Sequence, residues 1–327
     1  MSPSPDQRAG CLLGLALGDA LGFVVEAEPP EVARRHAAAL RAGRGAERSH
    51  SRFPFGQYSD DTQLSRELLI SIREARGFSP EAFGRRVAAL FASGRDVGAG
   101  PGTRGAALRL AAGVSWRDAG APSPYAGNGS AMRAAPIGVL IGAEGDELSR
   151  VAVEQSRVTH HDPRCAAGAL AMAAAARAAA RPGPIDPAAW VSEVAAVVRP
   201  FDEGVARAIE LAGGWVSLRP ADAHAALTAA ELDPGSPGGA LGISAHVVPT
   251  VGWAVYSFLR CPDSFSEAVA VAIEVGGDTD TMGAMAGALV GARVGRRGLP
   301  AELLDRVNDR GRWGAGALAR LAGVSLV

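Results

Sequence analysis

Hydroxyl and carboxylate side chains gather in three short segments of the sequence. They are YSDDTQLS at 58–65, GGDTDTM at 276–282 and VVEAE at 24–28, the last of which follows an apolar run that contains Asp19. The first two segments each have an ordinary explanation when taken alone, because Ser and Asp side chains accept hydrogen bonds from the free N–H groups at the start of a helix.

Together, these segments supply a ligand set made only of oxygen. Such sets select hard cations such as Mg²⁺, Mn²⁺ or Ca²⁺, whereas zinc prefers His or Cys. A single ion does not need so many carboxylates, but two ions sharing a bridging aspartate do, and the cations offset the repulsion among the acids. The sequence therefore favours a two-ion site with these acids: Glu26, Asp60, Asp61, Asp278 and Asp280.

Two other interpretations of residues 278–281 do not fit the sequence. An EF-hand loop needs Asp or Asn at its fifth position, where this chain has Met282. A phosphatase of the Asp-x-Asp-x-Thr type also uses a lysine, and all 33 basic residues of this chain are arginines. The lack of lysine excludes Schiff-base catalysis and a P-loop as well.

Composition narrows the class of protein further. The 33 basic and 34 acidic residues give a net charge of −1, which argues against a stable nucleic-acid partner. The three cysteines have no partner at zinc-ligand spacing. The apolar run at 11–25 is interrupted by Asp19 and is shorter than the roughly 20 residues of a membrane span. We therefore expect a cytoplasmic protein with no membrane association.

The local patterns predict an all-α protein. Residues 80–92, 163–181 and 263–275 are rich in strong helix formers, and each follows or begins with Ser or Asp at a plausible N-cap. Residues 243–256 are the best strand candidate, although a helix that starts at Pro249 explains them as well. No change of composition marks a boundary, so we expect one domain over residues 1–327.

Two of the expected helices carry glycine at every fourth position. Gly10, Gly14, Gly18 and Gly22 form one series, and Gly283, Gly287 and Gly291 form the other. Glycine inside a helix costs about 1 kcal/mol relative to alanine. Since residues four apart share one face, each series allows close approach of another helix backbone, and we expect these first and last core helices to pack closely at the centre of the fold.

Five segments of the chain resemble the ADP-ribosylglycohydrolase family in sequence and in order. They are 14–26 (GLALGDALGFVVE), 58–65 (YSDDTQLS), 127–138 (GNGSAMRAAPIG), 156–163 (SRVTHHDP) and 276–289 (GGDTDTMGAMAGAL). The resemblance implies a compact, single-domain, all-α fold with a dinuclear metal site in a cleft for ADP-ribose. It implies two divalent cations, Mg²⁺ or Mn²⁺, with two sets of ligands: Ser59, Asp60, Asp61 and Asp280 for one, and Glu26, Asp278, Asp280 and Thr281 for the other. Ser59 stands where many members have threonine.

The chemistry of the residues agrees with the activity that the resemblance implies. Cleavage of a glycosidic bond at an anomeric carbon builds oxocarbenium character, which carboxylates stabilise. A carboxylate can then deprotonate the attacking water or protonate the leaving group. Glu26 and Asp61 are our candidates for this step, and the sequence does not divide it between them.

Binding of ADP-ribose is expected to depend on backbone N–H groups, because the chain has no lysine for the pyrophosphate. Glycine lets the backbone come close, and residues 127–130, followed by a helix from Ala131, would form such a cradle. Arg133 could add charge or be structural, and the resemblance adds His160. The expected substrate contacts are Gly100, Gly102, Thr103, Gly127, Asn128, Gly129, Ser130, Met132 and His160.

The acceptor is left open by the sequence. We expect an ADP-ribosylated protein or another modified acceptor as partner, with arginine favoured over serine or nucleic acid, and ADP-ribose as product. A monomer is expected. The alternatives are a catalytically silent ADP-ribose-binding protein on the same fold and a hydrolase of another ribosyl nucleotide; the complete set of acids favours the enzyme.

Overall fold

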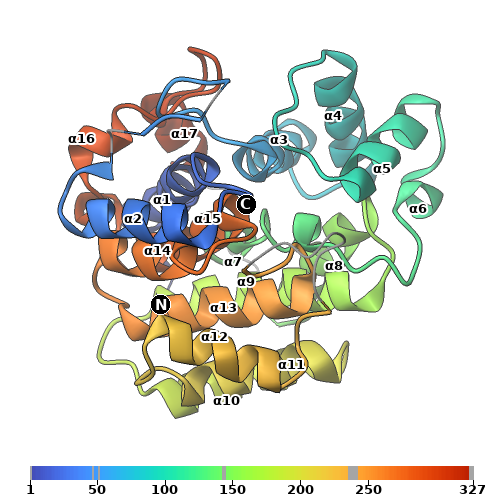
Figure 1. Ribbon diagram of the computed structural model, residues 1–327. Coiled ribbons are helices and arrows are strands. Elements are labelled where there is room, and N and C mark those ends of the chain that lie inside the picture. Colours follow the sequence, from blue (N-terminus) through green and yellow to red (C-terminus); the bar gives the residue numbers. More distant parts are fainter. Residues whose placement is uncertain (1, 46–47, 51, 142–144, 235–241, 324–327) are drawn as a thin grey trace.

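Helices make up the regular structure of this chain. The computed structural model describes residues 2–45, 48–50, 52–141, 145–234 and 242–323, and in these ranges it has no strand, only isolated β-bridges. The prediction of an all-α protein is confirmed (Figure 1). The α-helices are α1 (Pro5–Phe23), α2 (Pro30–Arg41), α3 (Asp60–Ala75), α4 (Pro80–Ala92), α5 (Pro101–Ala111), α6 (Trp116–Ala119), α7 (Ala135–Leu140), α8 (Asp146–Arg157), α9 (Pro163–Ala179), α10 (Pro187–Val198), α11 (Glu203–Gly214), α12 (Pro220–Ala229), α13 (Val247–Arg260), α14 (Phe265–Ile273), α15 (Thr279–Val294), α16 (Ala301–Leu304) and α17 (Ala315–Ala322).

The centre of the fold is the antiparallel pair α1 and α15 (Figure 1). Their two glycine series face each other, as expected. A Cβ atom added at Gly14 would lie 2.2 Å from the carbonyl oxygen of Gly287, and one added at Gly18 would lie 2.0 Å from that of Gly283. The two backbones therefore touch directly, and no larger residue fits between them.

This antiparallel packing brings the end of α1 to the beginning of α15. A Cβ atom at Gly22 would lie 2.0 Å from the carbonyl oxygen of Thr279. Helix α3 starts at the same place, and helices α4, α5 and α6 lie on one side of this centre, with α10 to α13 on the other (Figure 1). The first turns of α3 and α15, which carry partial positive charge, thus meet at one point of the core.

Two local expectations need correction. The helix expected from Ala131 begins only at Ala135, and residues 128–130 form the short 3-10 helix η2 (Asn128–Ser130). Pro136 explains the shift, because a proline without an N–H group is accommodated in the first turn of a helix and not in its interior.

Residues 243–256 are not a strand, because most of them belong to helix α13, which starts two residues before Pro249. Residues 247–259 are all buried. Val, Trp and Tyr, which favour strands, are frequent in this short buried segment, which is why its sequence also fits a strand. Among the described residues, no helix is long and apolar enough to span a membrane.

Candidate metal centre

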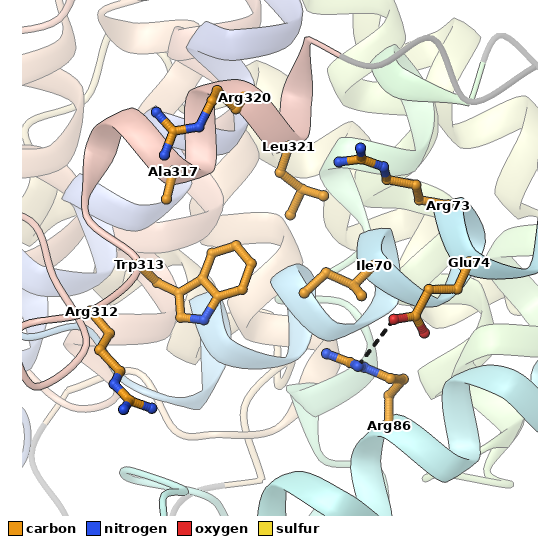
Figure 2. A pocket seen from close by; sticks show the side chains of 9 residues that line it. All are labelled: Ile70, Arg73, Glu74, Arg86, Arg312, Trp313, Ala317, Arg320 and Leu321. Atoms are coloured by element: carbon orange, nitrogen blue, oxygen red, sulfur yellow. Dashed lines mark hydrogen bonds and ion pairs between the residues drawn. The ribbon is translucent and has the colours of Figure 1, made fainter.

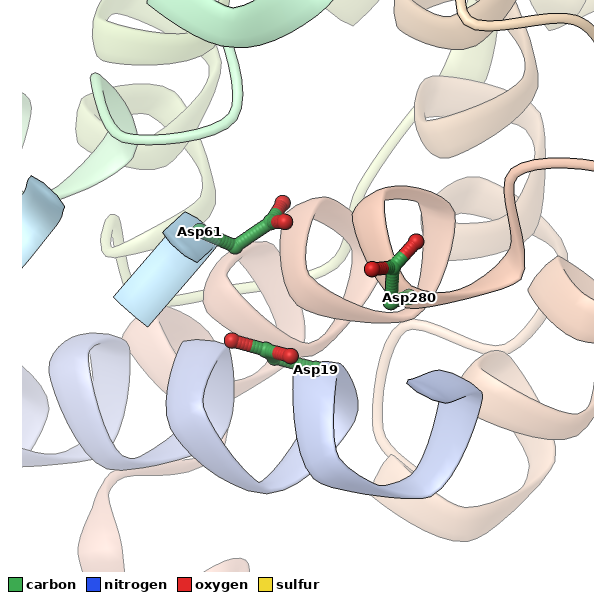
Figure 3. A group of neighbouring side chains, drawn as sticks. All are labelled: Asp19, Asp61 and Asp280. Atoms are coloured by element: carbon green, nitrogen blue, oxygen red, sulfur yellow. The ribbon is translucent and has the colours of Figure 1, made fainter. Parts of the chain in front are cut away.

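The three acidic segments meet where the end of α1 lies beside the first turns of α3 and α15. Figure 3 shows Asp19, Asp61 and Asp280 around this point, and one carboxylate oxygen from each lies within 4.8 Å of the other two. Oxygens of Glu26, Asp278 and Asp280 form a second group within the same distance. Asp280 belongs to both groups, so it is placed as a carboxylate shared by two cation positions would be.

All of these acids except Asp19 line a small hollow of about 130 Å³. Its lining also includes glycine-rich segments of two loops and His160. The predicted residues that line it are Glu26, Asp60, Asp61, Gly100, Thr103, Gly127, Asn128, Gly129, Met132, His160, Asp278, Asp280 and Thr281. Three other predicted residues, Ser59, Gly102 and Ser130, are not part of its lining.

Ser59 lies behind the lining and positions Asp61. Its side chain is the N-cap of α3: it accepts a hydrogen bond from the Asp61 N–H at 3.3 Å and donates one to Asp61 Oδ2 at 2.9 Å. The N–H of Asp60 donates to the carbonyl oxygen of Val97 at 2.7 Å. Helix capping and a metal centre are therefore compatible explanations of the same Ser-Asp-Asp segment.

Asp19 fixes the start of this helix from α1. The side chain is fully buried, its Oδ1 accepts from the Ser59 N–H at 2.8 Å and its Oδ2 accepts from the Thr62 N–H at 3.0 Å. Burial raises the pKa of Asp19 to about 6, against the opposing effect of the hydrogen bonds from Thr62 and Ser59. Asp19 was not among the predicted site residues, although an acid inside an apolar, glycine-rich helix already indicates a buried carboxylate with a specific role.

The cluster carries more negative charge than its own hydrogen bonds can compensate. Asp61 Oδ1 is buried and has no hydrogen-bond partner. Burial, and then the neighbouring carboxylates, raise the pKa values of Asp60, Asp61 and Asp280 well above the usual range, and burial followed by Asp278 raises the pKa of Glu26 to about 7. A buried oxygen-only cluster with an unpartnered carboxylate oxygen fits divalent cations, which would favour the ionised forms.

Asn128 connects the glycine-rich loop to the acids. Its side-chain amide donates to Asp278 Oδ2 at 2.5 Å and to Thr250 Oγ1 at 3.1 Å. The Asn128 N–H donates to the carbonyl oxygen of Ala245 at 3.0 Å. The side chain thus orients an acid of the cluster, a role that the sequence did not indicate.

His160 and Tyr125 form the aromatic wall of the hollow. Their ring centroids are 5.8 Å apart, and the Nδ1 of His160 lies 2.8 Å from Thr159 Oγ1. Burial lowers the pKa of His160 to about 3, so the ring is neutral near pH 7. Tyr125 was not predicted; the only signal was an aromatic residue within the Gly- and Pro-rich loop at 120–130.

Two of the predicted residues that do not line the hollow support its walls. The Ser130 hydroxyl is buried and donates to the carbonyl oxygen of Cys165 at 3.0 Å. Gly102 donates its N–H to the hydroxyl oxygen of Tyr125 at 3.3 Å and lines a neighbouring hollow of about 580 Å³. Arg133 is a structural residue: it is fully buried and donates to the carbonyl oxygen of Gly129 at 2.8 Å.

Comparison with known proteins gives a consistent result. Residues 1–325 match the family model described as ADP-ribosylglycohydrolase. The human protein ADP-ribosylhydrolase ARH3 is 26% identical over 319 residues, which are 89% of this chain and 86% of that protein. ADP-ribosylarginine hydrolase Tri1 of Pseudomonas putida is 27% identical over 312 residues, 92% of this chain and 74% of its own. A solved structure titled "ADP-ribosylglycohydrolase-related protein complex" superimposes with a TM-score of 0.70 at 29% identity and covers 98% of this chain and 97% of that chain.

Proposed function

Because the chain belongs to the ADP-ribosylglycohydrolase family, we propose that it is a metal-dependent hydrolase that releases ADP-ribose from a modified acceptor. The observation that carries this proposal is the carboxylate cluster, in which Asp280 is common to two groups of potential ligands. The unpartnered oxygen of Asp61 supports it, because a buried carboxylate oxygen with no partner is costly unless a cation binds it. Since the family match runs over nearly all of the chain, we treat residues 1–327 as one domain.

The cluster offers positions for two divalent cations, with Asp280 as the shared ligand. Oxygen ligands suit Mg²⁺ and Mn²⁺ equally well. When bound, such cations hold the ribose hydroxyls and make a coordinated water more acidic. The ligands we propose are Ser59, Asp60, Asp61 and Asp280 at one position and Glu26, Asp278, Asp280 and Thr281 at the other.

Glu26 is the better placed of the two candidates for proton transfer. Asp61 is held by Ser59 and belongs to the buried interior of the cluster, whereas Glu26 lies at its rim and remains partly exposed. Burial and the neighbouring Asp278 raise the pKa of Glu26 to about 7 when no cation is bound. The feature that favours Glu26 is its partial exposure, because a group that exchanges a proton with water or a leaving group must be within their reach. We propose that Glu26 takes a proton from the attacking water or gives one to the departing group.

The remainder of ADP-ribose needs more room than the metal centre offers. The hollow of about 130 Å³ is smaller than the roughly 300–1,000 Å³ of typical ligand pockets. The neighbouring hollow of about 580 Å³ shares Pro101 and Tyr125 with it. We propose that the ribose at the scissile bond binds among the acids, and that the other end of the ligand passes Tyr125 into the larger hollow.

Arginine is the acceptor that we favour. The support is the name of the Pseudomonas putida relative, an ADP-ribosylarginine hydrolase that covers 92% of this chain. A catalytically silent ADP-ribose-binding protein is the alternative, and the presence of all five predicted acids in one cluster, including the partly exposed Glu26, argues against it. A hydrolase of another ribosyl nucleotide would use the same cluster.

The test is release of free ADP-ribose from substrates modified on arginine, on serine and on DNA, each with Mg²⁺, with Mn²⁺ and with chelator. We expect release from the arginine substrate that stops in chelator and in Asp280→Asn, while Glu302→Gln, a change at an exposed acid, keeps wild-type rates. Binding of ADP-ribose without release from any substrate would support the silent protein instead. Full activity of Asp280→Asn would overturn the assignment of the site.

A further inference from the structure

A second hollow lies at the opposite end of α3 from the metal centre. Its volume is about 750 Å³, and α3, α4 and the segment from Arg312 through α17 form its walls (Figure 2). It shares no lining residue with the metal centre. Because α3 rises about 1.5 Å per residue, the ten residues from Asp60 to Ile70 separate the two places by about 15 Å. This hollow has no part in the hydrolysis proposed above.

The rim of this hollow is strongly cationic. Figure 2 shows four arginines around it, of which Arg86 pairs with Glu74 at 3.4 Å and with Glu67 at 2.6 Å. Within the described part of the chain, the side chains of the other three have no hydrogen-bond or ion-pair partner. They are Arg73, Arg312 and Arg320. Three exposed guanidinium groups thus lie around the edge of one hollow, and such groups match phosphate in charge and in hydrogen-bond geometry.

The floor of the hollow is a flat aromatic surface held in place from behind. The guanidinium carbon of Arg66 lies 5.2 Å from the centre of the Trp313 ring, and the Tyr58 hydroxyl donates to the Trp313 carbonyl oxygen at 3.2 Å. The backbone of Trp313 has a φ of 47°, a left-handed conformation that is uncommon for a large side chain. Arg66 is itself fixed by Asp309 at 2.9 Å. The indole ring is therefore oriented before any ligand arrives.

We propose that this hollow is a separate binding site for a nucleoside diphosphate or triphosphate. The base would stack on the Trp313 indole, with Ile70 and Leu321 as apolar edges, and the phosphates would bind Arg73, Arg312 and Arg320. The volume of about 750 Å³ suits a ligand of that size. An acidic peptide would pair with the arginines but has no base to stack on the Trp313 indole. Inorganic phosphate would likewise make no stacking contact with the ring.

The experiment is calorimetric titration of the full-length chain with ADP in chelator, on an Asp280→Asn background that disables the metal centre. Because the cleft beside the metal centre can also take an ADP moiety, the variants identify the second hollow: we expect Arg73→Glu with Arg320→Glu to weaken one ADP-binding step by about tenfold or more. Arg34→Glu with Arg35→Glu is the matched control, because it reverses two exposed charges on α2. Trp313→Ala should weaken ADP binding and leave pyrophosphate binding unchanged.

Hydrogen exchange locates the site independently of affinity. ADP should slow amide exchange in α17 and in the second half of α3, and circular dichroism should show that all variants keep the wild-type helix content. The proposal is overturned if ADP does not bind in millimolar concentrations, or if both double variants weaken it equally. Pyrophosphate binding as tight as that of ADP, or binding of a polyglutamate peptide in its place, would also overturn it.

Discussion

The hydroxyl of Thr62 donates a hydrogen bond of 2.6 Å to Asp19 Oδ2, and this bond joins the central helix α1 to the first turn of α3. The same oxygen also accepts from the Thr62 N–H, and Oδ1 accepts from the Ser59 N–H. Donors from the start of α3 thus converge on one buried carboxylate that lies about 40 residues earlier in the chain. The position of the Ser-Asp-Asp segment is set by Asp19 as much as by α3 itself.

Replacing Asp19 by Asn should therefore destabilise the protein and weaken cation binding. The new amide cannot accept from both Ser59 and Thr62 as the carboxylate does, because one of its two side-chain positions is a donor. We expect a loss of about 1–3 kcal/mol in the free energy of unfolding, as for a buried polar group without a partner. Denaturant titration measures this loss, and Asp305→Asn, at an exposed acid, should leave stability unchanged. Equal stability of the two variants would show that Asp19 does not hold α3.

Asn128→Ala should lower cation affinity while the fold is kept. The Asn128 amide orients Asp278 through a bond of 2.5 Å, and loss of such support behind a ligand typically costs about 10–100-fold in metal affinity. Titration calorimetry with Mn²⁺ checks this expectation. The matched control is Asn308→Ala, since Asn308 does not line the hollow and its amide donates to the carbonyl oxygen of Arg306. An unchanged Mn²⁺ affinity in Asn128→Ala would remove Asp278 from the ligand set.

The pH dependence of stability should change sign when a divalent cation is added. In chelator, the folded pKa of Glu26 is raised to about 7 and that of Asp19 to about 6, whereas the unfolded values are near 4. Groups with raised folded pKa values stabilise the protein below the unfolded pKa, and this contribution is lost as pH rises through the folded pKa. As far as these two groups determine it, the melting temperature in chelator should therefore decrease as the pH rises from about 4 to about 7.

With saturating Mg²⁺ or Mn²⁺, the ionised carboxylates are the bound form. Cation binding then releases protons, and the stabilisation by the cation should grow as pH rises over the same window. Thermal melts at several pH values, with and without cation, give both curves. If the two curves stay parallel between about pH 4 and pH 7, the cluster does not bind the cation.

The sequence was sufficient to predict that the acids cluster and that the glycine-rich helices pack closely, but not the parts that depend on tertiary contacts. The acids of 58–65 and 276–282 belong to short local motifs, so they could be predicted. The close packing of α1 and α15 could be predicted as well, because the four-residue spacing of their glycines places them on one face of each helix. Asp19 and Tyr125 could not, because their importance arises from residues distant in the chain. The helix start at Ala135 follows from Pro136, and this boundary could have been predicted from the position of the proline in the sequence.

Gly18→Ala tests the central packing of α1 against α15. The added Cβ atom would lie 2.0 Å from the Gly283 carbonyl oxygen, so the two helices would have to move apart. We expect a net destabilisation of about 1–3 kcal/mol, as for overpacking of a tight core. This figure is what is left after the gain in helix propensity on replacing glycine by alanine. Because α1 also carries Asp19, such a movement should reduce cation affinity as well.

Gly214→Ala is the control, since a Cβ atom at the end of α11 meets nothing within 4 Å and should change stability by less than about 1 kcal/mol. If Gly18→Ala were as stable as Gly214→Ala, the direct backbone contact between the two central helices would be wrong, and with it the explanation of why both series consist of glycine.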